Sequence, residues 1–576
     1  MDKEVPTQKT ISAADRPWLA IYPPDVPARI DQPAHRLVGD LAHDLAAHRR
    51  DARAFTTVMP NGMAASLSFA DVDRLSDAFA AYLREVLRLE QGDRVAVQVP
   101  NGLVYPVAAF GIVKAGCVLV NINPLYKAHE MAHVFADAEP SAIVAINLFA
   151  DRLGEALKDA PIPHIILSEA ASLFPMASRR LIGFMLKYVK REVPPAQFRH
   201  TPIARALALG AVHIDRGLNV KDYTNGLEPS ATACLQYTGG TTGKSKGAML
   251  THRNLLINVA QFINFRGDDM RESDHVLTVL PLYHIFAFTV NFLGFFSVGG
   301  HSVLIPSPRP LSNLRKAFEK EAISFILGVN TLFNGLLNEA WFCANPPKNL
   351  RVALAGGMTL QDTVARRWQE VTGTPVAEGY GLTEASPVLA LNPLGRERLG
   401  TIGLPLPSTD MKCVGDDGAE VPVGEPGEIV ARGPQIMPGY WRQPAETANV
   451  LHDGWLSTGD IGIMDAEGYF RIVDRRKDMI LVSGFNVYPN EVEAVLSGLA
   501  GVKECAVVGV PDSVTGEAVK AFVVRSDPAL DAKAIRDFCR CELSGYKVPK
   551  FVEFREDLPK SNVGKILRRE LRAPSN

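Results

Sequence analysis

The sequence predicts an α/β fold with a large N-terminal domain of βαβ-type subdomains, a β-rich subdomain and a small α+β C-terminal domain. Three observations predict this class. Strand-length apolar runs alternate with helix-length amphipathic runs as far as about residue 400. Short strands with Gly-Pro turns follow, and the end of the chain has an αβ pattern of its own. The length of 576 residues allows about four domain-sized units.

The alternation in the N-terminal domain is clearest in two stretches. Predicted strands at 94–99 and 117–122 flank a predicted helix at 105–114. Predicted strands at 324–329 and 351–355 repeat the pattern, and a predicted helix at 360–371 follows them. Such alternation is typical of largely parallel sheets.

An apolar run at 285–298 stands apart from the alternation. It is shorter than the roughly 20 residues that span a bilayer, so we expect a buried helix.

The chain changes character beyond about residue 400. An acidic loop at 414–427 lies between short strands, which predicts a β-rich subdomain over about 400–474. A charged run at 474–478 marks the next boundary, so we expect an N-terminal domain at 1–474 and a C-terminal domain at 475–576. The C-terminal pattern is given by predicted helices and strands at 491–499, 504–510, 519–524 and 534–543.

Composition excludes several classes of protein. Hydrophobic residues make up 47% and charged residues 22%, which excludes a disordered chain, a collagen and a coiled coil. The 61 basic and 63 acidic residues give a net charge of −2, with no global reason to expect a nucleic-acid partner. Seven cysteines without C-x-x-C or zinc-finger spacing predict free thiols in a reducing compartment. No signal peptide is apparent at 1–16, so we expect a cytoplasmic protein.

One segment, 179–191, combines five basic side chains with a large apolar face. This composition suits the headgroup boundary of an anionic membrane, and would place the protein peripherally on the inner face of the cytoplasmic membrane. The alternative is a surface helix that packs its apolar side on the body. A homodimer is left open.

The sharpest signal is the segment YTGGTTGKSKG at 237–247, which follows a predicted strand at 231–237. A short apolar stretch, 248–250, comes next, and Thr251 is a candidate N-cap of the following helix. Glycine N–H groups, hydroxyls and lysines can together bind a triphosphate. A Walker P-loop would need glycine where Thr238 stands, which disfavours a P-loop kinase or GTPase. The candidate nucleotide-binding residues here are Thr238, Gly239, Gly240, Thr241, Thr242, Gly243 and Lys246.

This loop resembles the phosphate-binding signature of the adenylate-forming superfamily, which contains acyl-CoA synthetases, adenylation domains of peptide synthetases and firefly-type luciferases. The resemblance covers nearly the whole chain. Within the superfamily the sequence most resembles bacterial long-chain fatty-acid–CoA ligases, through the segments 22–27, 281–286 and 478–489.

The resemblance implies roles for a second nucleotide segment, YGLTE at 380–384. In the family Tyr380 stacks on adenine, Thr383 contacts the α-phosphate, and Glu384 helps to hold Mg²⁺ together with Thr238. A hard cation that bridges phosphates prefers such oxygen ligands. The resemblance adds further nucleotide contacts at Gly356, Gly357 and Gly381, at Asp460 for the ribose hydroxyls, and at Arg475 for the ribose or phosphate.

The resemblance also implies residues for catalysis and domain motion. Lys565, in the C-terminal motif 559–566, is expected to be the catalytic lysine of adenylation, because an ammonium offsets the repulsion between carboxylate and phosphate. Lys477 is the expected hinge, with Asp474 as the alternative, for a mobile C-terminal domain. Rotation would bring Ser483, Gly484 and Phe485 toward the thioester site where CoA reacts.

Two groups of candidates have an ordinary structural interpretation as well as a functional one. His284 is either a catalytic residue beside the carboxylate or a core histidine, while Lys246 adds positive charge to the phosphate loop. The aromatic residues Phe286, Phe288 and Phe292 either line an acyl pocket or form ordinary core. Some long-chain relatives have a gating tryptophan where Phe288 stands, so the sequence departs from these relatives here and leaves gating open.

The resemblance implies an ATP-dependent ligase. A medium- to long-chain fatty acid would form acyl-AMP and pyrophosphate, and coenzyme A would then displace AMP. The alternatives are a short-chain or aryl-acid CoA ligase, a fatty-acyl-AMP ligase, and a membrane-surface fatty-acid capture protein. Fatty-acyl-AMP ligases carry an insertion after the hinge, and none is present at 474–489.

Overall fold

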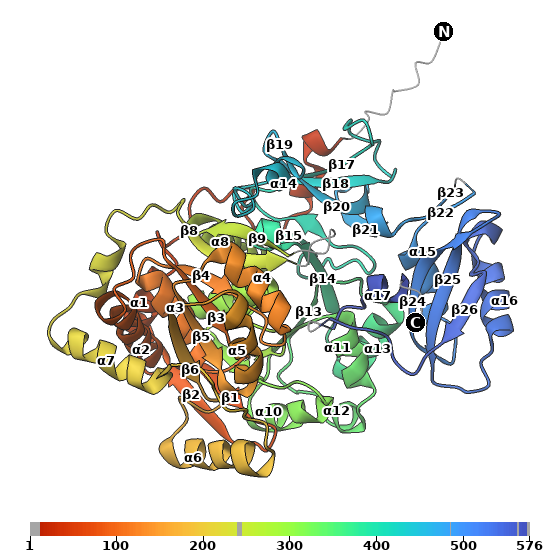
Figure 1. The fold of residues 1–576 in the computed structure, drawn as a ribbon. Coiled ribbons are helices and arrows are strands. Elements are labelled where there is room, and N and C mark those ends of the chain that lie inside the picture. The colour runs from red at the N-terminus through yellow and green to blue at the C-terminus, as the bar shows by residue number, and fades with distance from the viewer. Residues whose placement is uncertain (1–11, 239–244, 484, 562–563, 573–576) are drawn as a thin grey trace, which may run out of the picture.

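The computed structural model describes residues 12–238, 245–483, 485–561 and 564–572. These residues form a large lobe with three sheets and a smaller C-terminal lobe with a fourth (Figure 1). The chain passes from one lobe to the other just after strand β21 (Phe470–Arg475).

The first sheet of the large lobe has seven strands, all parallel except the edge strand β9. Alternate residues of its central strands face opposite layers: Val95 and Val97 belong to the main core, and Ala96 to a second core. Because both faces are covered, strands such as the fully buried β5 are almost continuously apolar. In spatial order the strands are β7 (Thr201–Pro202), β6 (His164–Ser168), β5 (Ala142–Ile146), β3 (Arg94–Gln98), β4 (Val118–Asn121), β8 (Thr232–Thr238) and β9 (Lys246–Thr251).

The second sheet has nine strands, parallel in its centre and antiparallel at both edges. The carboxyl ends of its central strands face the part of the candidate active site, described below, against which the C-terminal lobe docks. In order the strands are β16 (Leu404–Pro405), β15 (Val388–Leu391), β14 (Val376–Gly381), β13 (Val352–Ala355), β12 (Phe325–Gly328), β10 (His275–Thr278), β11 (His301–Leu304), β1 (Arg53–Val58) and β2 (Ala64–Ser68).

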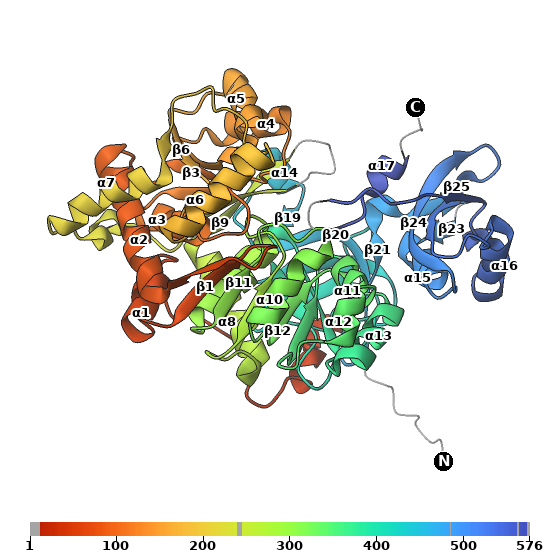
Figure 2. The same cartoon turned by 90° about the horizontal axis from the view of Figure 1, so that it is seen from below.

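Helices pack against the first two sheets of the large lobe (Figures 1 and 2). Thr251 caps helix α8 as expected, because its side chain accepts a hydrogen bond from the backbone N–H of Asn254. The helices are α1 (Asp40–His48), α2 (Phe69–Ala81), α3 (Val104–Lys114), α4 (Ala128–Ala138), α5 (Ala150–Asp159), α6 (Met176–Phe184), α7 (Ile203–Asp215), α8 (His252–Arg266), α9 (Phe295–Ser297), α10 (Arg315–Lys320), α11 (Asn330–Leu337), α12 (Ala340–Ala344) and α13 (Asp362–Thr372).

The third sheet is antiparallel and carries the short strands predicted beyond residue 400. It consists of β17 (Asp410–Val414), β18 (Gly427–Arg432), β20 (Trp455–Met464), β19 (Leu451–His452) and β21, with helix α14 (Pro444–Ala448) beside it. The acidic segment 414–427 joins β17 to β18, as expected.

The C-terminal lobe has one mixed sheet with its own apolar core. Its strands are β23 (Phe485–Val487), β22 (Ile480–Val482), β25 (Gly516–Arg525), β24 (Val502–Asp512) and β26 (Phe551–Phe554). Its helices are α15 (Pro489–Ser497), α16 (Ala532–Glu542) and α17 (Arg568–Arg572).

The predicted elements of both lobes are confirmed, with one difference at the phosphate loop. The stretch 248–250 is part of β9, which pairs antiparallel with β8, so the loop joins two strands before the helix begins. The buried run 285–298 is helical as predicted, with a wide π-type stretch over Ala287–Gly294. Among the described residues, no helix is long and apolar enough to cross a bilayer.

Candidate active site

The two residues that flank the phosphate loop are paired with each other in the first sheet. Thr238, the last residue of β8, lies opposite Lys246, the first residue of β9. The predicted contacts Gly239, Gly240, Thr241, Thr242 and Gly243 lie outside the described residues. Backbone hydrogen bonds from Trp441 to Gly247 (2.7 Å) and from Met249 to Gly439 (3.0 Å) fix β9 to the third sheet's subdomain.

Lys246 is held at the foot of this loop by two groups from the same subdomain. Its ammonium forms an ion pair with Glu446 on α14, and it lies 5.1 Å from the ring centroid of Tyr440. The side chain is only 13% exposed. Lys246 therefore lies at the foot of the loop with its ammonium paired to Glu446, and its role toward phosphate stays a prediction.

Glu384 lies in a tight turn, Thr383–Ala385, just beyond the end of β14 at Gly381. Its Oε1 accepts a hydrogen bond of 2.7 Å from the hydroxyl of Tyr440. Burial, and then the charge of Glu384, raise the pKa of Tyr440, so this phenol stays protonated and donates. Tyr440 thus contacts both Glu384 and Lys246, and the sequence analysis missed it because an aromatic after Gly439 carries no separate signal.

Tyr380 and Asp460 are brought together from two different sheets. The Tyr380 hydroxyl donates to Asp460 Oδ2 at 2.6 Å, and burial together with Asp460 raises the pKa of this tyrosine. Asp460 lies on β20 opposite Arg475 on β21, and Arg475 Nε is 3.2 Å from Asp460 Oδ1. The residues predicted for adenine and ribose are therefore direct neighbours.

The glycine loop after β13 lies beside this pair. A Cβ at Gly356 would come within 3.1 Å of the Phe286 ring and 3.5 Å of the Gly379 carbonyl, so glycine permits the close approach of loop and strand. Gly357 has φ +78°, a conformation that favours glycine. The loop is therefore packed directly against the strand that carries Tyr380.

Lys565 is presented by a short hairpin that docks on the large lobe. The Ser561 N–H donates to the Lys565 carbonyl at 2.7 Å, and Thr331 Oγ1 at the start of α11 donates to the Gly564 carbonyl at 3.1 Å. A Cβ at Gly564, which has φ +84°, would lie 2.6 Å from that hydroxyl oxygen. Glycine before the lysine is therefore what lets the hairpin sit against α11.

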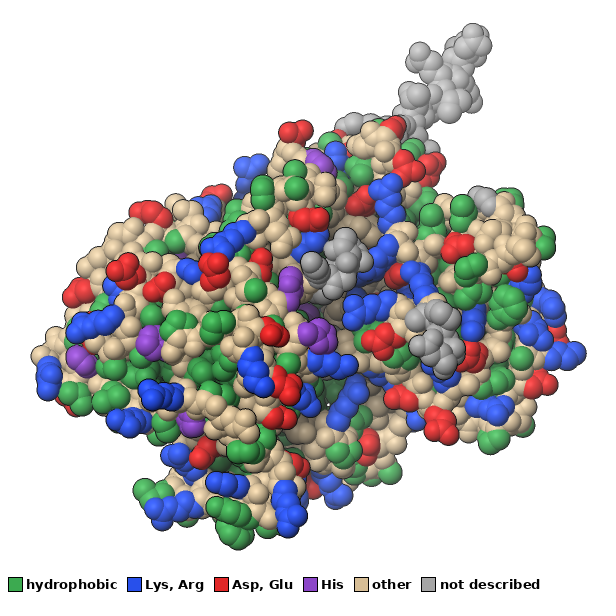
Figure 3. Space-filling view, viewed as in Figure 1, with side chains coloured by type: hydrophobic (Ala, Val, Ile, Leu, Met, Phe, Trp, Pro, Cys, Tyr) green, Lys and Arg blue, Asp and Glu red, His purple; other side chains and the backbone are tan. Residues whose placement is uncertain are grey.

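The electrostatic environment of Lys565 identifies its neighbours. Enclosure by surrounding atoms, and then the positive charge of Arg475, lower the pKa of Lys565 to about 7, while Asp460 opposes the shift. Burial, with Lys565 as the second cause, lowers the pKa of His284 to about 4. Lys565, His284, Asp460 and Arg475 therefore converge between the lobes. Figure 3 shows Lys and Arg side chains around the hollow there.

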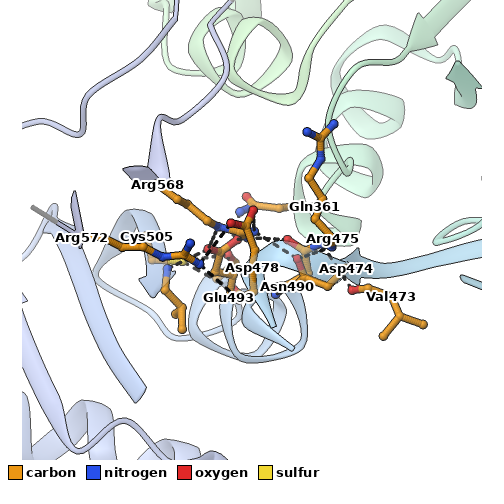
Figure 4. A network of polar contacts seen from close by, with 12 residues as sticks. Gln361, Val473, Asp474, Arg475, Asp478, Asn490, Glu493, Cys505, Arg568 and Arg572 are labelled. Atoms are coloured by element: carbon orange, nitrogen blue, oxygen red, sulfur yellow. Dashed lines mark hydrogen bonds and ion pairs between the residues drawn. The ribbon is translucent and has the colours of Figure 1, made fainter. Parts of the chain in front are cut away.

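A polar network joins the segment of the predicted hinge to helix α17 (Figure 4). Arg568, three residues after Lys565, contacts Asp474 (3.2 Å), Asp478 (3.5 Å), Glu493 (2.8 Å) and Asn490 (2.5 Å). Asp474 has no exposed side-chain surface, and it also accepts hydrogen bonds from the N–H groups of Arg475 and Asn490. The sequence analysis named Asp474 but missed Arg568, because its partners lie 75 to 94 residues earlier in the chain.

The other hinge and CoA candidates lie toward solvent. Lys477 is exposed in the turn Arg476–Asp478, and its pKa is lowered by partial burial and by Arg475. Ser483 adopts a left-handed φ of +51°. Phe485 is 56% exposed and stacks on Tyr546 with ring centroids 4.9 Å apart, while Gly484 lies outside the described residues.

The candidate acyl-pocket residues divide between site and core. Phe286 packs beside Gly356 at the site. Phe288 and Phe292 are each about 1% exposed, and Phe292 packs against Phe55 and Phe110 in the aromatic core. Their role in an acyl pocket stays a prediction.

Comparisons with known proteins agree with this arrangement. The model of the AMP-binding enzyme family matches residues 42–441, and that of the AMP-binding enzyme C-terminal domain matches residues 491–565. The chain is 47% identical to a long-chain-fatty-acid–CoA ligase of Salmonella typhi over 557 residues, or 96% of this chain and 97% of the relative. It is 35% identical to a feruloyl-CoA synthase of Amycolatopsis sp over 520 residues, which are 90% and 95% of the two chains. The crystal structure of ATP-bound MatB from Rhodopseudomonas palustris has a TM-score of 0.78 at 28% identity, with 93% and 98% coverage.

Proposed function

The chain belongs to the family of AMP-binding enzymes, and from this premise we propose how its two lobes act together on a carboxylic acid. It is an ATP-dependent ligase that activates a fatty acid and transfers it to coenzyme A. A carboxylate is a poor electrophile because oxide would have to leave. Attack of the carboxylate on the α-phosphate of ATP forms acyl-AMP and releases pyrophosphate. The CoA thiol then attacks the acyl carbon, and AMP leaves with the electron pair of the C–O bond.

The observation that carries this function is similarity over almost the full length of both lobes to long-chain-fatty-acid–CoA ligases. The site geometry is consistent with it, because an ammonium with a pKa near 7 stands close to the candidate ribose-binding Asp460. We assign Lys565 to charge neutralisation between the incoming carboxylate and the α-phosphate. His284 is neutral at physiological pH, so it can accept or donate a hydrogen bond there without adding charge.

The large lobe supplies the nucleotide contacts in this proposal. Tyr380, Gly356 and Gly357 would surround the adenine, Asp460 and Arg475 would bind the ribose, and Lys246 would attract the phosphates. Glu384 and Thr238 offer the oxygen ligands that Mg²⁺ prefers. A bound Mg²⁺ would neutralise phosphate charge, and Tyr440 would keep the Glu384 carboxylate oriented toward it.

The chain-length preference is tested by measuring AMP release across saturated acids of graded length, with and without CoA. We expect kcat/KM to rise toward long chains and turnover to depend on CoA. A second candidate, an aryl-acid CoA ligase, is favoured only by the 35% identity to feruloyl-CoA synthase. Faster AMP release with ferulate than with any aliphatic acid would select that alternative.

We also propose that α6 and the π-helical segment that continues it, Met185–Val189, bind the surface of an anionic membrane. Phe184, Tyr188 and Val189 are 57%, 61% and 64% exposed, and basic side chains such as Lys187 lie among them. Apolar side chains would insert below the headgroups, and the cations would contact anionic lipid. In Figure 1, α6 lies at the outer edge of the large lobe, away from the C-terminal lobe.

Vesicle sedimentation tests this surface. We expect binding to vesicles with phosphatidylglycerol, weaker binding to phosphatidylcholine alone, and loss of binding in the double variant Phe184→Ser/Tyr188→Ser. The control Val514→Ser changes another exposed apolar side chain, 84% exposed on the C-terminal lobe, and should bind as the wild type does. Equal binding by all three proteins would overturn the proposal.

A further inference from the structure

Two histidines and a glutamate lie together at the amino ends of central strands of the nine-stranded sheet, at the opposite end of these strands from the candidate active site. His275 and His301 are the first residues of β10 and β11, and they lie opposite each other in the parallel register. Glu321 follows α10 directly. Figure 2 shows β1, β11, β12 and α10 side by side in this part of the large lobe. The carboxyl end of β10 leads toward His284, so the cluster lies at the other end of the same strand.

The donor atoms of the three side chains lie close together. Nδ1 of His275 lies 3.5 Å from Glu321 Oε2, and Nδ1 of His301 lies 4.0 Å from the same oxygen. All three donor atoms lie within 4.8 Å of one another. Four ligands at Zn–N and Zn–O bond lengths of about 2.1 Å stand about 3.4 Å apart in a tetrahedron, so an ion would draw the three donor atoms together by up to about 1.4 Å.

Both Nδ1 atoms are buried. Among the described residues, that of His301 has no hydrogen-bond partner, while that of His275 faces only the Glu321 carboxylate. The His301 side chain is only 5% exposed, so water does not readily satisfy its nitrogen. A buried, unpaired nitrogen costs free energy unless a ligand occupies it.

The surroundings resemble the outer shell of a metal site. Nε2 of His301 lies 2.7 Å from Thr56 Oγ1, which in turn lies 2.7 Å from Ser66 Oγ. When Nε2–H donates to Thr56, Nδ1 carries the lone pair, the tautomer that a metal requires. The partial exposure of His275, 21%, leaves a path for an ion and a solvent ligand.

One charge opposes a cation here. Arg53 binds both oxygens of Glu321, at 3.0 and 3.1 Å, so an ion would share Oε2 with a guanidinium N–H. The Arg53–Glu321 pair is neutral overall, and an added dication is therefore not fully compensated. This favours a metal that bonds strongly to imidazole over Mg²⁺ or Ca²⁺, which prefer oxygen-only sites.

We propose that His275, His301 and Glu321 form a zinc site that joins the amino ends of β10 and β11 to the corner between α10 and β12. Solvent completes the tetrahedron. The ion acts on stability rather than on catalysis, because it lies at the amino ends of the strands, away from the nucleotide contacts.

Zinc titration of chelator-treated full-length protein tests the site, with calorimetry for affinity and elemental mass spectrometry for stoichiometry. We expect about one Zn²⁺ per chain, a rise in Tm on zinc addition, and a visible absorption band of tetrahedral Co²⁺ when cobalt replaces zinc. The variants His275→Asn and His301→Gln should lose the tight binding and the Tm rise. Thr56→Val should weaken binding about 10- to 100-fold by freeing the His301 tautomer.

The matched control is His452→Gln, which removes an exposed histidine on β19 and should bind zinc as the wild type does. Should His301→Gln fail to fold, the partly exposed His275→Asn carries the test. Activity with a long-chain acid should stay within about twofold in His275→Asn. Absence of tight zinc binding in the wild type, or unchanged binding in His275→Asn, would overturn the proposal.

Discussion

The candidate active site has two halves that are held in very different ways. In the large lobe the polar groups are fixed in pairs by their own lobe: Tyr380 to Asp460, Tyr440 to Glu384, and Lys246 to Glu446. The C-terminal lobe contributes its half of the site through one hairpin. This hairpin accepts a hydrogen bond from the Thr331 hydroxyl of the large lobe at the Gly564 carbonyl.

The lobes share further side-chain contacts, among them Gln361 with Ser497 (2.8 Å), Arg568 with Asp474 (3.2 Å) and the Asn490 backbone N–H with Asp474 (2.8 Å). A site built in this way can keep the nucleotide contacts constant while it exchanges the group that faces the acyl carbon. Such an exchange is what a two-step reaction with a lid motion requires.

Removing the ammonium that the C-terminal half contributes should have the largest effect. We expect Lys565→Ala to lower acid-dependent pyrophosphate exchange at least about 100-fold, because one preorganised charge at a transition state is worth that much. Thioester formation from supplied acyl-AMP should stay within a few-fold of wild type. Lys560→Ala, on the same hairpin, is the control, and equal loss of both half-reactions would refute the assignment.

The pH dependence should report the same lysine. With a pKa of about 7 in the free enzyme, Lys565 loses its proton as the pH rises through neutrality, and the protonated form is the active one. We therefore expect kcat/KM for adenylation to fall about tenfold per pH unit above the pKa. Thioester formation from acyl-AMP should lack this descending limb. A flat adenylation profile between pH 6 and about 9 would contradict the role.

Loosening the link between the halves should have an intermediate effect. Arg568→Gln leaves Asp474 and Glu493 without their cation, and we expect adenylation to fall about tenfold. Faster proteolysis near the turn Arg476–Asp478 should accompany the loss. Arg569→Gln is the matched control, because it removes an exposed arginine of the same helix. Unchanged adenylation with unchanged proteolysis would show that Arg568 does not hold the lobes in this orientation.

A change within the fixed half should be the smallest. Tyr440→Phe removes the hydrogen bond to Glu384 and keeps the ring beside Lys246, so we expect about a tenfold loss at most. The loss should appear as a higher Mg²⁺ requirement, read as the shift of the half-saturating Mg²⁺ concentration for nucleotide binding. Tyr469→Phe, whose hydroxyl donates to the Arg396 carbonyl, is the control. Identical Mg²⁺ titrations of Tyr440→Phe and the wild type would show that Tyr440 has no role in Mg²⁺ binding.

The sequence was sufficient for the elements and for residues that stand in local motifs. Apolar runs predicted β3, β4 and β13, because strands covered on both faces are continuously apolar. The Thr251 cap was predictable because capping depends on neighbouring residues.

The pairs that hold the site were not predictable. Tyr440 and Glu384 are 56 residues apart, and Arg568 and Asp474 are 94 residues apart. Such contacts depend on how separate sheets meet, which no local pattern encodes. The strand β9 was overlooked for a related reason, since its six residues form a strand only by pairing with β8.

The most direct test of the whole account follows oxygen atoms. A long-chain fatty acid labelled with ¹⁸O in both carboxylate positions is converted with ATP, Mg²⁺ and CoA, and the nucleotide and phosphate products are weighed by mass spectrometry. Attack of the carboxylate on the α-phosphate predicts AMP that carries one ¹⁸O atom and pyrophosphate that carries none. Label in phosphate or pyrophosphate, or AMP without label, would contradict an acyl-adenylate intermediate.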